Sequence, residues 1–388
     1  MIWLRLEEGF DMCLIRCCFV ITAILFSGQS FSETLEKIKV ASGGHIVHFL
    51  PFDVAVAKGF FTEEGLEPEI TYLKGGTATA QALLAEQVDF SLNSIDHAFK
   101  AAVQGKTNLR MVALMNRLPG MVLVVDAKYR DRVENISDLK GMTLGVTSKG
   151  SATHMVLSYL LHKSGVQQQE VTIIKAGAST FPPALENGQI DGGIALEPFA
   201  SILEERGKAF VLADLNNLET AKQVFGGPYN QAGILVRQEM IDKSPDVVHR
   251  FVNAISRSLQ WMSQQSEEAI AEVLPPQVTG SDKARYILTL KKLREFYSPE
   301  GRIDPEGVGN VMRSMSVSGA IPENSGLDTG KFFTNQFVES YLSVGNTVST
   351  PVDEMDEDIG EGGSNYLFFW GMGGLVLLMF FMMRRRKG

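Results

Sequence analysis

The body of this 388-residue chain lacks cysteine. All three cysteines, Cys13, Cys17 and Cys18, lie near the amino terminus. We expect that leader to be removed, so the mature chain would have no disulfide, thiol nucleophile or thiolate metal site. No cysteine lies at the expected cleavage site either, which argues against attachment through a lipidated cysteine.

The chain also lacks the short motifs that carry common chemistries. It has no HExxH metal motif, no GxSxG nucleophile elbow and no GxxxxGK[ST] phosphate loop. Its formal net charge is −9, whereas a nucleic-acid partner favours a concentrated basic face. We therefore expect no catalytic residues, no metal site, no cofactor and no nucleic-acid partner.

The amino-terminal 32 residues have the pattern of a signal peptide. A short apolar run, FVITAILF at 19–26, precedes Ser30 and Ser32, which suit the −3 and −1 positions of a cleavage site. Three acidic residues lie where a positive region is expected, so Met12 is a better start than Met1. The alternative is an uncleaved amino-terminal anchor.

The carboxyl-terminal end predicts a membrane anchor. Residues 366–383, YLFFWGMGGLVLLMFFMM, are continuously apolar and would span about 27 Å as a helix. The basic end at 384–388 should stay cytoplasmic, which places the body in the periplasm or on the extracytoplasmic face. An acidic linker at 345–365 would join body and anchor. Gly362 and Gly363, ahead of the apolar run, leave an alternative open. In it the carboxyl-terminal segment is a sorting signal that is cleaved off, and not a permanent anchor.

Within the body there is an internal repeat with an offset of roughly one hundred residues. Three pairs of segments match: KIKVASGG (37–44) and MTLGVTSKG (142–150), PEITYLKGGTAT (68–79) and EVTIIKAGAST (170–180), ALLAEQVDFSL (82–92) and ALENGQIDGGIA (184–195). This offset is too long for a solenoid period. It predicts two similar α/β lobes of alternating strands and helices.

Two apolar strands, at 121–129 and 232–240, flank the second copy and predict a two-strand hinge. The first lobe would then be discontinuous, comprising 33–125 and 232–344, with 126–231 inserted as the second lobe. A helix is expected after the hinge, because Pro245 precedes apolar residues at helical spacing.

Polar and glycine-containing turns follow several predicted strands. In LGVTSKGSATH, a strand ends near Thr147, and a helix should begin at Ser151 or Ala152. A helix amino terminus favours an anion or a carbonyl oxygen, and Gly150 permits close backbone approach. We therefore expect this turn to form one side of a polar ligand-binding cleft. The alternative is that Ser151 only caps its helix.

Four longer stretches resemble the nitrate/sulfonate/taurine-type substrate-binding proteins of ABC importers. They are FLPFDVAVAKGFFTEEGLEPEI, KGGTATAQALLAEQVDFSL, ISDLKGMTLGVTSKGSATH and ALENGQIDGGIALEP. The likeness covers about 37–342. It implies a type II periplasmic-binding-protein fold, capture of a small molecule between two lobes, and delivery to a membrane permease. The same superfamily includes thiamine-pyrimidine synthase-like enzymes, whose cysteine-rich motif is absent here.

The residues and the resemblance together give a set of candidate ligand-binding positions. They are His45, His48, Phe49, Gly76, Thr77, Asn93, Asn116, Thr147, Gly150, Ser151, Ala152, Thr153, Thr180 and Glu197. Glu197, the histidines, Phe49 and Phe181 favour a ring-bearing or mixed-polarity ligand over a simple inorganic anion. Each histidine has the alternative of being a satisfied or solvated polar residue.

We therefore expect the binding component of a small-molecule importer, with a ligand of the sulfonate, nitrate or vitamin-precursor class. Two alternatives remain open at this point: an enzyme of the pyrimidine-synthase type, and a membrane-anchored ligand sensor.

Overall fold

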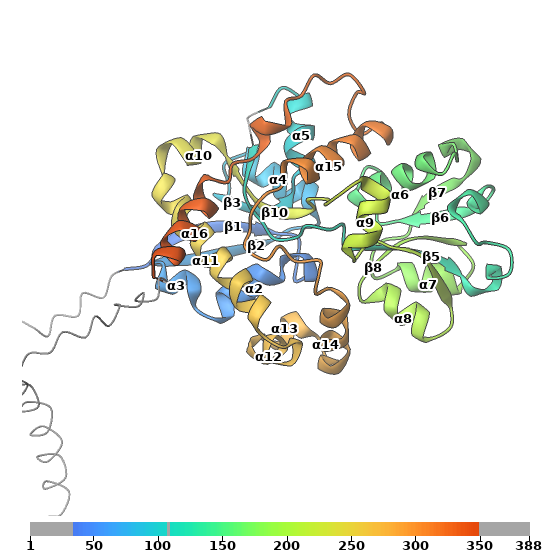
Figure 1. Cartoon of the computed structure of the whole chain (residues 1–388), viewed down its shortest axis with the longest axis horizontal. Coiled ribbons are helices and arrows are strands. Elements are labelled where there is room, and N and C mark those ends of the chain that lie inside the picture. Colours follow the sequence, from blue (N-terminus) through green and yellow to red (C-terminus); the bar gives the residue numbers. More distant parts are fainter. Residues whose placement is uncertain (1–33, 107–108, 349–388) are drawn as a thin grey trace, which may run out of the picture. The chain divides into compact units, whose positions relative to one another are not determined.

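The computed structural model describes residues 34–106 and 109–348 (Figure 1). The predicted signal peptide, the predicted span at 366–383 and its basic end lie outside these residues. Helix α16 (Gln336–Val348) continues past the predicted start of the acidic linker at 345, and the rest of that linker is also outside the described residues. In the described ranges, every helix is too short or too polar to cross a membrane.

Two five-stranded sheets form the framework of the body (Figure 1). The first sheet has the order β2 (Leu66–Tyr72), β1 (Glu36–Ser42), β3 (Phe90–Ser94), β10 (Ala232–Arg237), β4 (Leu109–Leu114). The second has the order β7 (Thr172–Lys175), β6 (Thr143–Val146), β8 (Gly192–Leu196), β5 (Met121–Asp126), β9 (Ala209–Asp214). In each sheet the fourth strand runs antiparallel to its neighbours, and the other paired strands are parallel. The predicted duplication into two α/β lobes is confirmed.

The fourth strand of each sheet directly follows a crossing between the lobes. β5 lies before the predicted insertion at 126–231 but pairs with β8 and β9 of the second sheet. β10 follows that segment and pairs with β3 and β4 of the first sheet. The predicted boundary after residue 125 is therefore too late, because β5 belongs to the second lobe and not to a separate hinge pair. The chain crosses between the lobes at 115–120 and again at 226–231.

The crossing segments hydrogen-bond to each other. The backbone N–H of Gln231 donates to the carbonyl of Asn116 at 3.0 Å, and that of Tyr229 donates to the carbonyl of Arg117 at 2.9 Å. The chain thus passes between the lobes through these two short connections and not through strands β5 and β10, and a hinge at this place stays a prediction.

One aspartate of each repeat fixes the start of a central strand. The Asp89 carboxylate accepts from the backbone N–H of Lys39 at 2.8 Å, and the Asp191 carboxylate accepts from that of Thr143 at 2.9 Å. Each aspartate also donates its own N–H to the carbonyl of the same partner residue. The repeated Gln-aliphatic-Asp pattern thus pins the third parallel strand of each lobe beside the first.

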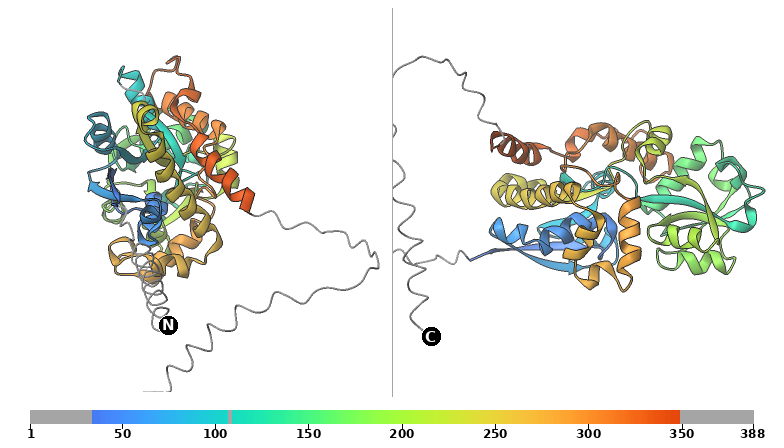
Figure 2. Two further views of the ribbon diagram at one scale, coloured as in Figure 1. Left: turned by 90° about the vertical axis from the view of Figure 1, so that its left-hand side faces the viewer. Right: turned by 60° about the horizontal axis from the view of Figure 1, so that its bottom comes forward.

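Helices cover both faces of the sheets (Figures 1 and 2). The first lobe carries α2 (Leu50–Ala57), α3 (Phe60–Glu63), α4 (Gly76–Leu84) and α5 (Asp96–Val103). The second carries α6 (Ala152–Lys163), α7 (Phe181–Glu186), α8 (Phe199–Glu205) and α9 (Leu218–Phe225). The remaining helices are α10 (Gln238–Lys243), α11 (Pro245–Gln264), α12 (Glu267–Val273), α13 (Pro276–Thr279), α14 (Lys283–Lys292) and α15 (Pro305–Val317).

The core of the first lobe is centred on α11, the helix expected after the hinge. Its Phe251 is fully buried and stacks on Phe90 of β3, with ring centroids 3.9 Å apart. The rings of Phe52 on α2 and Phe61 on α3 complete this cluster. Because buried aromatic rings contribute large apolar areas, this cluster joins the C-terminal helices firmly to the first sheet.

Candidate functional site

A cavity of about 470 Å³ lies between the two lobes. The first lobe contributes His45 to His48, including the short 3-10 helix η1 (Val47–Phe49). The second lobe contributes Ala178 and the turn after β8, from Leu196 to Phe199. This size suits a small organic molecule. The carboxyl ends of the sheet strands therefore do meet at a common cavity, as parallel α/β topology favours.

Glu197 supplies the buried charge of this cavity. Its side chain is 7% exposed, and one carboxylate oxygen accepts from the hydroxyl of Ser201 at 2.7 Å and from its N–H at 3.2 Å. Burial raises the pKa of the carboxyl group, although the Ser201 bonds oppose that shift. The other carboxylate oxygen has no hydrogen bond within the described residues, so it can accept one from a ligand.

His45 is the centre of a hydrogen-bonded chain. Its Nδ1 lies 2.9 Å from Asp53 Oδ1, and its Nε2 lies 2.8 Å from the Tyr72 hydroxyl. Burial raises the pKa of Asp53 to about 6, while His45 opposes the shift. Both ring nitrogens of His45 are engaged, so the orientation of its imidazole at the cavity wall is fixed.

His48 lies deeper and is neutral. It is 7% exposed, packs edge-on against Phe296 with centroids 5.0 Å apart, and donates from Nε2 to the Pro119 carbonyl at 3.3 Å. Burial lowers the pKa of His48 to about 4. Phe49, expected at the site, instead packs in the core of the first lobe and does not line the cavity. Phe181 is likewise a core residue of the second lobe.

The turn before α6 is held together by its own hydroxyl groups. Ser151 Oγ donates to the Ser148 carbonyl at 2.7 Å and accepts from the His154 N–H at 3.3 Å, so Ser151 is the N-cap of α6. Thr153 Oγ1 accepts from the backbone N–H of Thr147 at 2.9 Å. None of these residues lines the 470 Å³ cavity. The geometry thus matches the alternative in which Ser151 only caps α6. A ligand contact at this turn stays a prediction.

The other three residues expected at the second-lobe turns, Gly150, Ala152 and Thr180, have structural contacts. Gly150 accepts through its carbonyl from Lys100 at 3.0 Å, and Ala152 begins α6. The Thr180 hydroxyl donates to the Ala176 carbonyl, one turn before α7. None of the three lines the cavity.

The turn before α4, which is the first-lobe counterpart of the Thr180 turn, is organised by Asn93. Its Nδ2 donates to the Gly76 carbonyl and to Thr79 Oγ1, both at 2.9 Å, and its Oδ1 accepts from the Ser94 N–H. Asn93 is buried and therefore positions the start of α4, where Thr77 is exposed. Asn116 is fully buried in the first crossing segment. Within the described residues, neither atom of the Asn116 amide group has a hydrogen-bond partner.

Half of the cavity wall was not expected from the sequence. It comes from α13, α14 and the loop between them, whose lining residues are Gln277, Val278, Thr279, Gly280, Ser281, Asp282, Arg285, Tyr286 and Thr289. The cavity-facing Tyr286 ring lies in a segment that packs on the first lobe through Leu274 and Leu290. No local motif marked these residues, because they reach the cavity only through tertiary packing.

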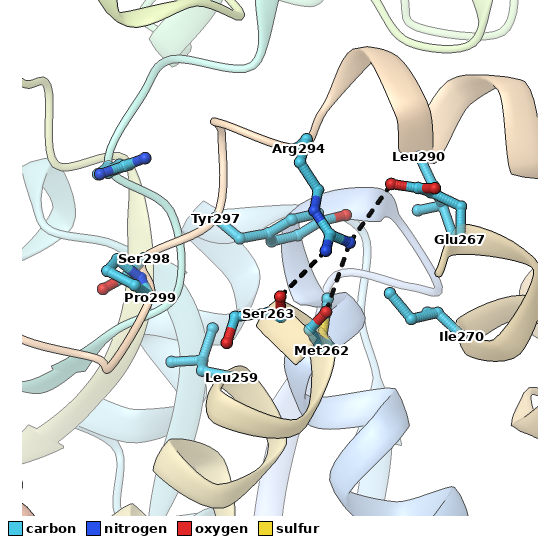
Figure 3. Close-up of a pocket in the computed structure, with 11 residues that line it drawn as sticks. Leu259, Met262, Ser263, Glu267, Ile270, Leu290, Arg294, Tyr297, Ser298 and Pro299 are labelled. Atoms are coloured by element: carbon cyan, nitrogen blue, oxygen red, sulfur yellow. Dashed lines mark hydrogen bonds and ion pairs between the residues drawn. The ribbon is translucent and has the colours of Figure 1, made fainter. Parts of the chain in front are cut away.

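A smaller cavity of about 190 Å³ lies among α11, α12 and α14 (Figure 3). Arg294 is one of its charged lining residues. It donates to the carbonyls of Ser263 at 3.0 Å and Gln265 at 2.9 Å and pairs with Glu267 at 3.3 Å. Arg294 thus satisfies the carboxyl-terminal end of α11. Because these donors are already engaged, this cavity is a weaker ligand-site candidate than the interlobe cavity.

The described residues contain no group of three or more His, Cys, Asp or Glu side chains placed to hold a metal ion. The interlobe cavity offers a buried carboxylate, two oriented histidines and aromatic surface from Phe199 and Tyr286. This arrangement suits reversible binding of a molecule that has both hydrogen-bond donors and an apolar face.

A family model described as NMT1/THI5 like matches residues 47–269. The chain belongs to this family. It is 27% identical to the putative binding protein YtlA of Bacillus subtilis over 83% of this chain and 93% of that protein. It is 25% identical to the riboflavin-binding protein RibY of Chloroflexus aurantiacus over 79% of this chain and 87% of that protein. The pyrimidine phosphate synthase of Schizosaccharomyces pombe is 25% identical over 54% of this chain and 60% of that enzyme.

Solved structures agree with the two-lobed fold. A protein of Bordetella bronchiseptica RB50 is 29% identical, with a TM-score of 0.71 over 80% of this chain and 98% of that chain. The periplasmic nitrate-binding protein NrtA of Synechocystis is 13% identical, with a TM-score of 0.65 over 80% and 89%. At that identity the likeness shows the fold alone. The expected α/β periplasmic-binding-protein fold is confirmed.

Proposed function

We propose that this protein is the extracytoplasmic substrate-binding component of an ABC importer, which captures a small molecule between its lobes and delivers it to a permease. The observation that carries the proposal is the interlobe cavity. Both lobes contribute residues to its lining, and two short connections join the lobes. Relatives described as binding proteins support it, and they span nearly the whole folded body. Affinity would come from closure, because a ligand that binds the closed state better shifts the hinge equilibrium.

The ligand class follows from the charge in the cavity. The buried charge is the carboxylate of Glu197, whereas the cavity-lining cation Arg285 already pairs with Glu205 at 2.7 Å. A ligand with N–H or O–H donors and a ring that packs on Tyr286 and Phe199 therefore fits better than nitrate or a small sulfonate. We infer a vitamin-precursor type of ligand with a heterocyclic ring.

Thermal-shift measurements with riboflavin, an aminopyrimidine, taurine and nitrate test this inference. A heterocycle at one hundred times its Kd should stabilise the protein by about 2.7 kcal/mol, whereas nitrate and taurine should not shift the unfolding temperature. If only the anions shift it, the proposed ligand class is wrong. If none of these compounds or related small molecules binds, the importer function itself loses support.

Glu197→Gln is expected to weaken ligand binding by about 10- to 100-fold. The substitution preserves size but removes the charge that strengthens a hydrogen bond to a ligand donor. Titration calorimetry with the ligand found above measures the change. Glu186→Gln is the matched control, since Glu186 is a second-lobe carboxylate that pairs at 3.6 Å with Arg206 and does not line the cavity. Equal affinity of both variants would contradict the role of Glu197.

We also infer that residues 366–383 anchor the body to the membrane, on the basis of their continuous apolar sequence and the basic residues that follow. The full-length chain should remain in the membrane fraction after an alkaline wash. A chain that ends at residue 365 should be released into the soluble fraction. Recovery of the full-length chain in the soluble fraction would contradict the anchor.

A second candidate function is catalysis of the pyrimidine-synthase type. The observation that favours it is the Tyr72–His45–Asp53 chain, because a histidine oriented by a carboxylate is the usual arrangement of a general base. The relative in Schizosaccharomyces pombe is such an enzyme. Product formation from a vitamin precursor by the purified protein, lost in His45→Asn, would establish catalysis. Binding without turnover supports the importer component.

A further inference from the structure

One lysine makes contact with both lobes. Lys100 lies on α5 of the first lobe, and its Nζ is 2.6 Å from Asp96 Oδ2 of the same helix. The same Nζ donates to the carbonyl of Gly150 at 3.0 Å. Gly150 belongs to the second lobe, in the turn capped by Ser151. Movement of the lobes away from each other would break the second contact and keep the first.

Asp96 fixes the position of the ammonium group before the lobes meet. Its side chain is fully buried, and its Oδ1 lies 3.3 Å from His97 Nδ1. Burial alone would raise the pKa of Asp96, but His97 and Lys100 outweigh it and hold the pKa well below its usual range. The carboxylate is therefore charged, and the four-residue spacing on a helix keeps Lys100 beside it. Little side-chain freedom remains to be lost when Gly150 approaches.

Two ion pairs also join the lobes, and both partners of each are partly exposed. Arg285 of α14 pairs with Glu205 of α8 at 2.7 Å, with side chains 34% and 46% exposed. Lys292 pairs with Glu204 at 3.3 Å, with side chains 45% and 47% exposed. Lys100 and Asp96 are 24% and 1% exposed. The Gly150 carbonyl that joins the lobes is also exposed, but its donor is already held by the buried Asp96. Because forming this bond orders less side-chain freedom than an ion pair between two exposed side chains, we expect it to stabilise the observed arrangement more than either α14 pair.

We propose that Lys100 is an interlobe latch, which stabilises the closed arrangement by bonding at once to Asp96 of the first lobe and to the Gly150 carbonyl of the second. The proposal concerns the closure on which ligand capture depends, so it rests on the proposed function. It assigns the Ser148–Ser151 turn a role that the hydroxyl contacts alone do not give it: the turn presents a carbonyl to the opposite lobe. Lys100 is a positioning residue here, because it acts on closure and not on the ligand.

The test uses Lys100→Met, which keeps the length of the side chain and removes the ammonium group. Spin labels at Gln81 on α4 and His162 on α6, both exposed, report the distance between the lobes in the ligand-free protein. Cys13, Cys17 and Cys18 are replaced by serine to leave two labelling sites. The matched control is Lys163→Met, because Lys163 donates to the carbonyls of Gln223 and Val224, both within the second lobe.

Lys100→Met is expected to raise the ratio of open to closed protein by about tenfold, at the lower end of the range for hydrogen bonds to charged groups. Lys163→Met should leave the distance distribution unchanged, and Lys292→Met should shift it by less than threefold. An unchanged distribution in Lys100→Met overturns the latch. Lys100→Gln is a second test variant, because glutamine is polar but too short to bridge both partners. An unchanged distance distribution in this variant also overturns the latch.

The distance measurement needs no ligand, so it separates this inference from the proposed function. When a ligand is available, its Kd should rise by the factor by which the closed fraction falls in the distance distribution, since affinity is proportional to the fraction of binding-competent protein. A rise in Kd without a change in the distance distribution would show that Lys100 touches the ligand, and would overturn the latch. A shifted distribution in a protein that binds no small molecule would keep the latch and refute the importer component.

Discussion

Gly193→Ala is expected to destabilise the protein by more than about 4 kcal/mol, which is exceptional for one methyl group. Gly193 lies on β8 with φ +138°, and an added Cβ would be 2.5 Å from the backbone nitrogen of Gly145 and 2.9 Å from its carbonyl carbon. Both are backbone atoms of β6, so no side-chain rotation can relieve the clash. The two central strands of the second lobe must separate or the variant must unfold.

Urea unfolding followed by circular dichroism measures this change, and Gly44→Ala is its matched control. Gly44 has a similar φ of +124°, but an added Cβ would meet nothing within 4 Å. Its cost should be that of the backbone conformation alone, about 1–3 kcal/mol. Equal losses in both variants would show that the close approach of β6 and β8 does not limit this position.

The second large effect is a loss of stability at acid pH through His48. Its pKa is about 4 in the folded protein because the ring is buried, and about 6.5 when unfolded. Between these values the unfolded chain binds a proton that the folded chain does not. The stability associated with neutral His48 is therefore complete above pH 6.5 and is lost as the pH falls towards 4. The expected total loss is about 3 kcal/mol.

His48→Gln isolates this contribution, because glutamine stays neutral and can still donate to the Pro119 carbonyl. The difference in unfolding free energy between wild type and variant should fall by about 3 kcal/mol from pH 7 to pH 4. A difference measurement is needed because Asp53 acts in the opposite direction. The pKa of Asp53 is raised to about 6, so its protonation favours the folded state as the pH falls. A pH-independent difference would contradict the assignment to His48.

The repeat made the two-lobed fold predictable from sequence. Asp89 and Asp191 show why: each makes the same pair of backbone contacts at the start of a strand, so the same local pattern had to recur. The placement of β5 in the second lobe was not predictable in this way. β5 and β10 are both apolar and look alike in sequence, and only the pairing partners of β5 decide the lobe to which it belongs.

The candidate site was predicted in part. His45, His48 and Glu197 do line the interlobe cavity, since they directly follow strands whose carboxyl ends meet there. Ser151 and Thr153 were equally reasonable from their residue types, yet their hydroxyl groups are used within their own turn. Tyr286 and Thr279 could not be predicted, because their segment is some eighty residues beyond the last repeat match in the sequence and reaches the cavity by packing on α2 and α11.

The insertion of the second lobe into the first also sets the order in which the molecule can be completed as the chain is made. All strands of the second sheet lie between Met121 and Asp214, whereas the first sheet waits for Ala232–Arg237 and its covering helix α11. The inserted half is thus the first to have all its strands available, although translation starts with the other half. Until α11 is synthesised, the aromatic residues of the first lobe that pack against it remain exposed. A chaperone is most useful to the chain in this interval.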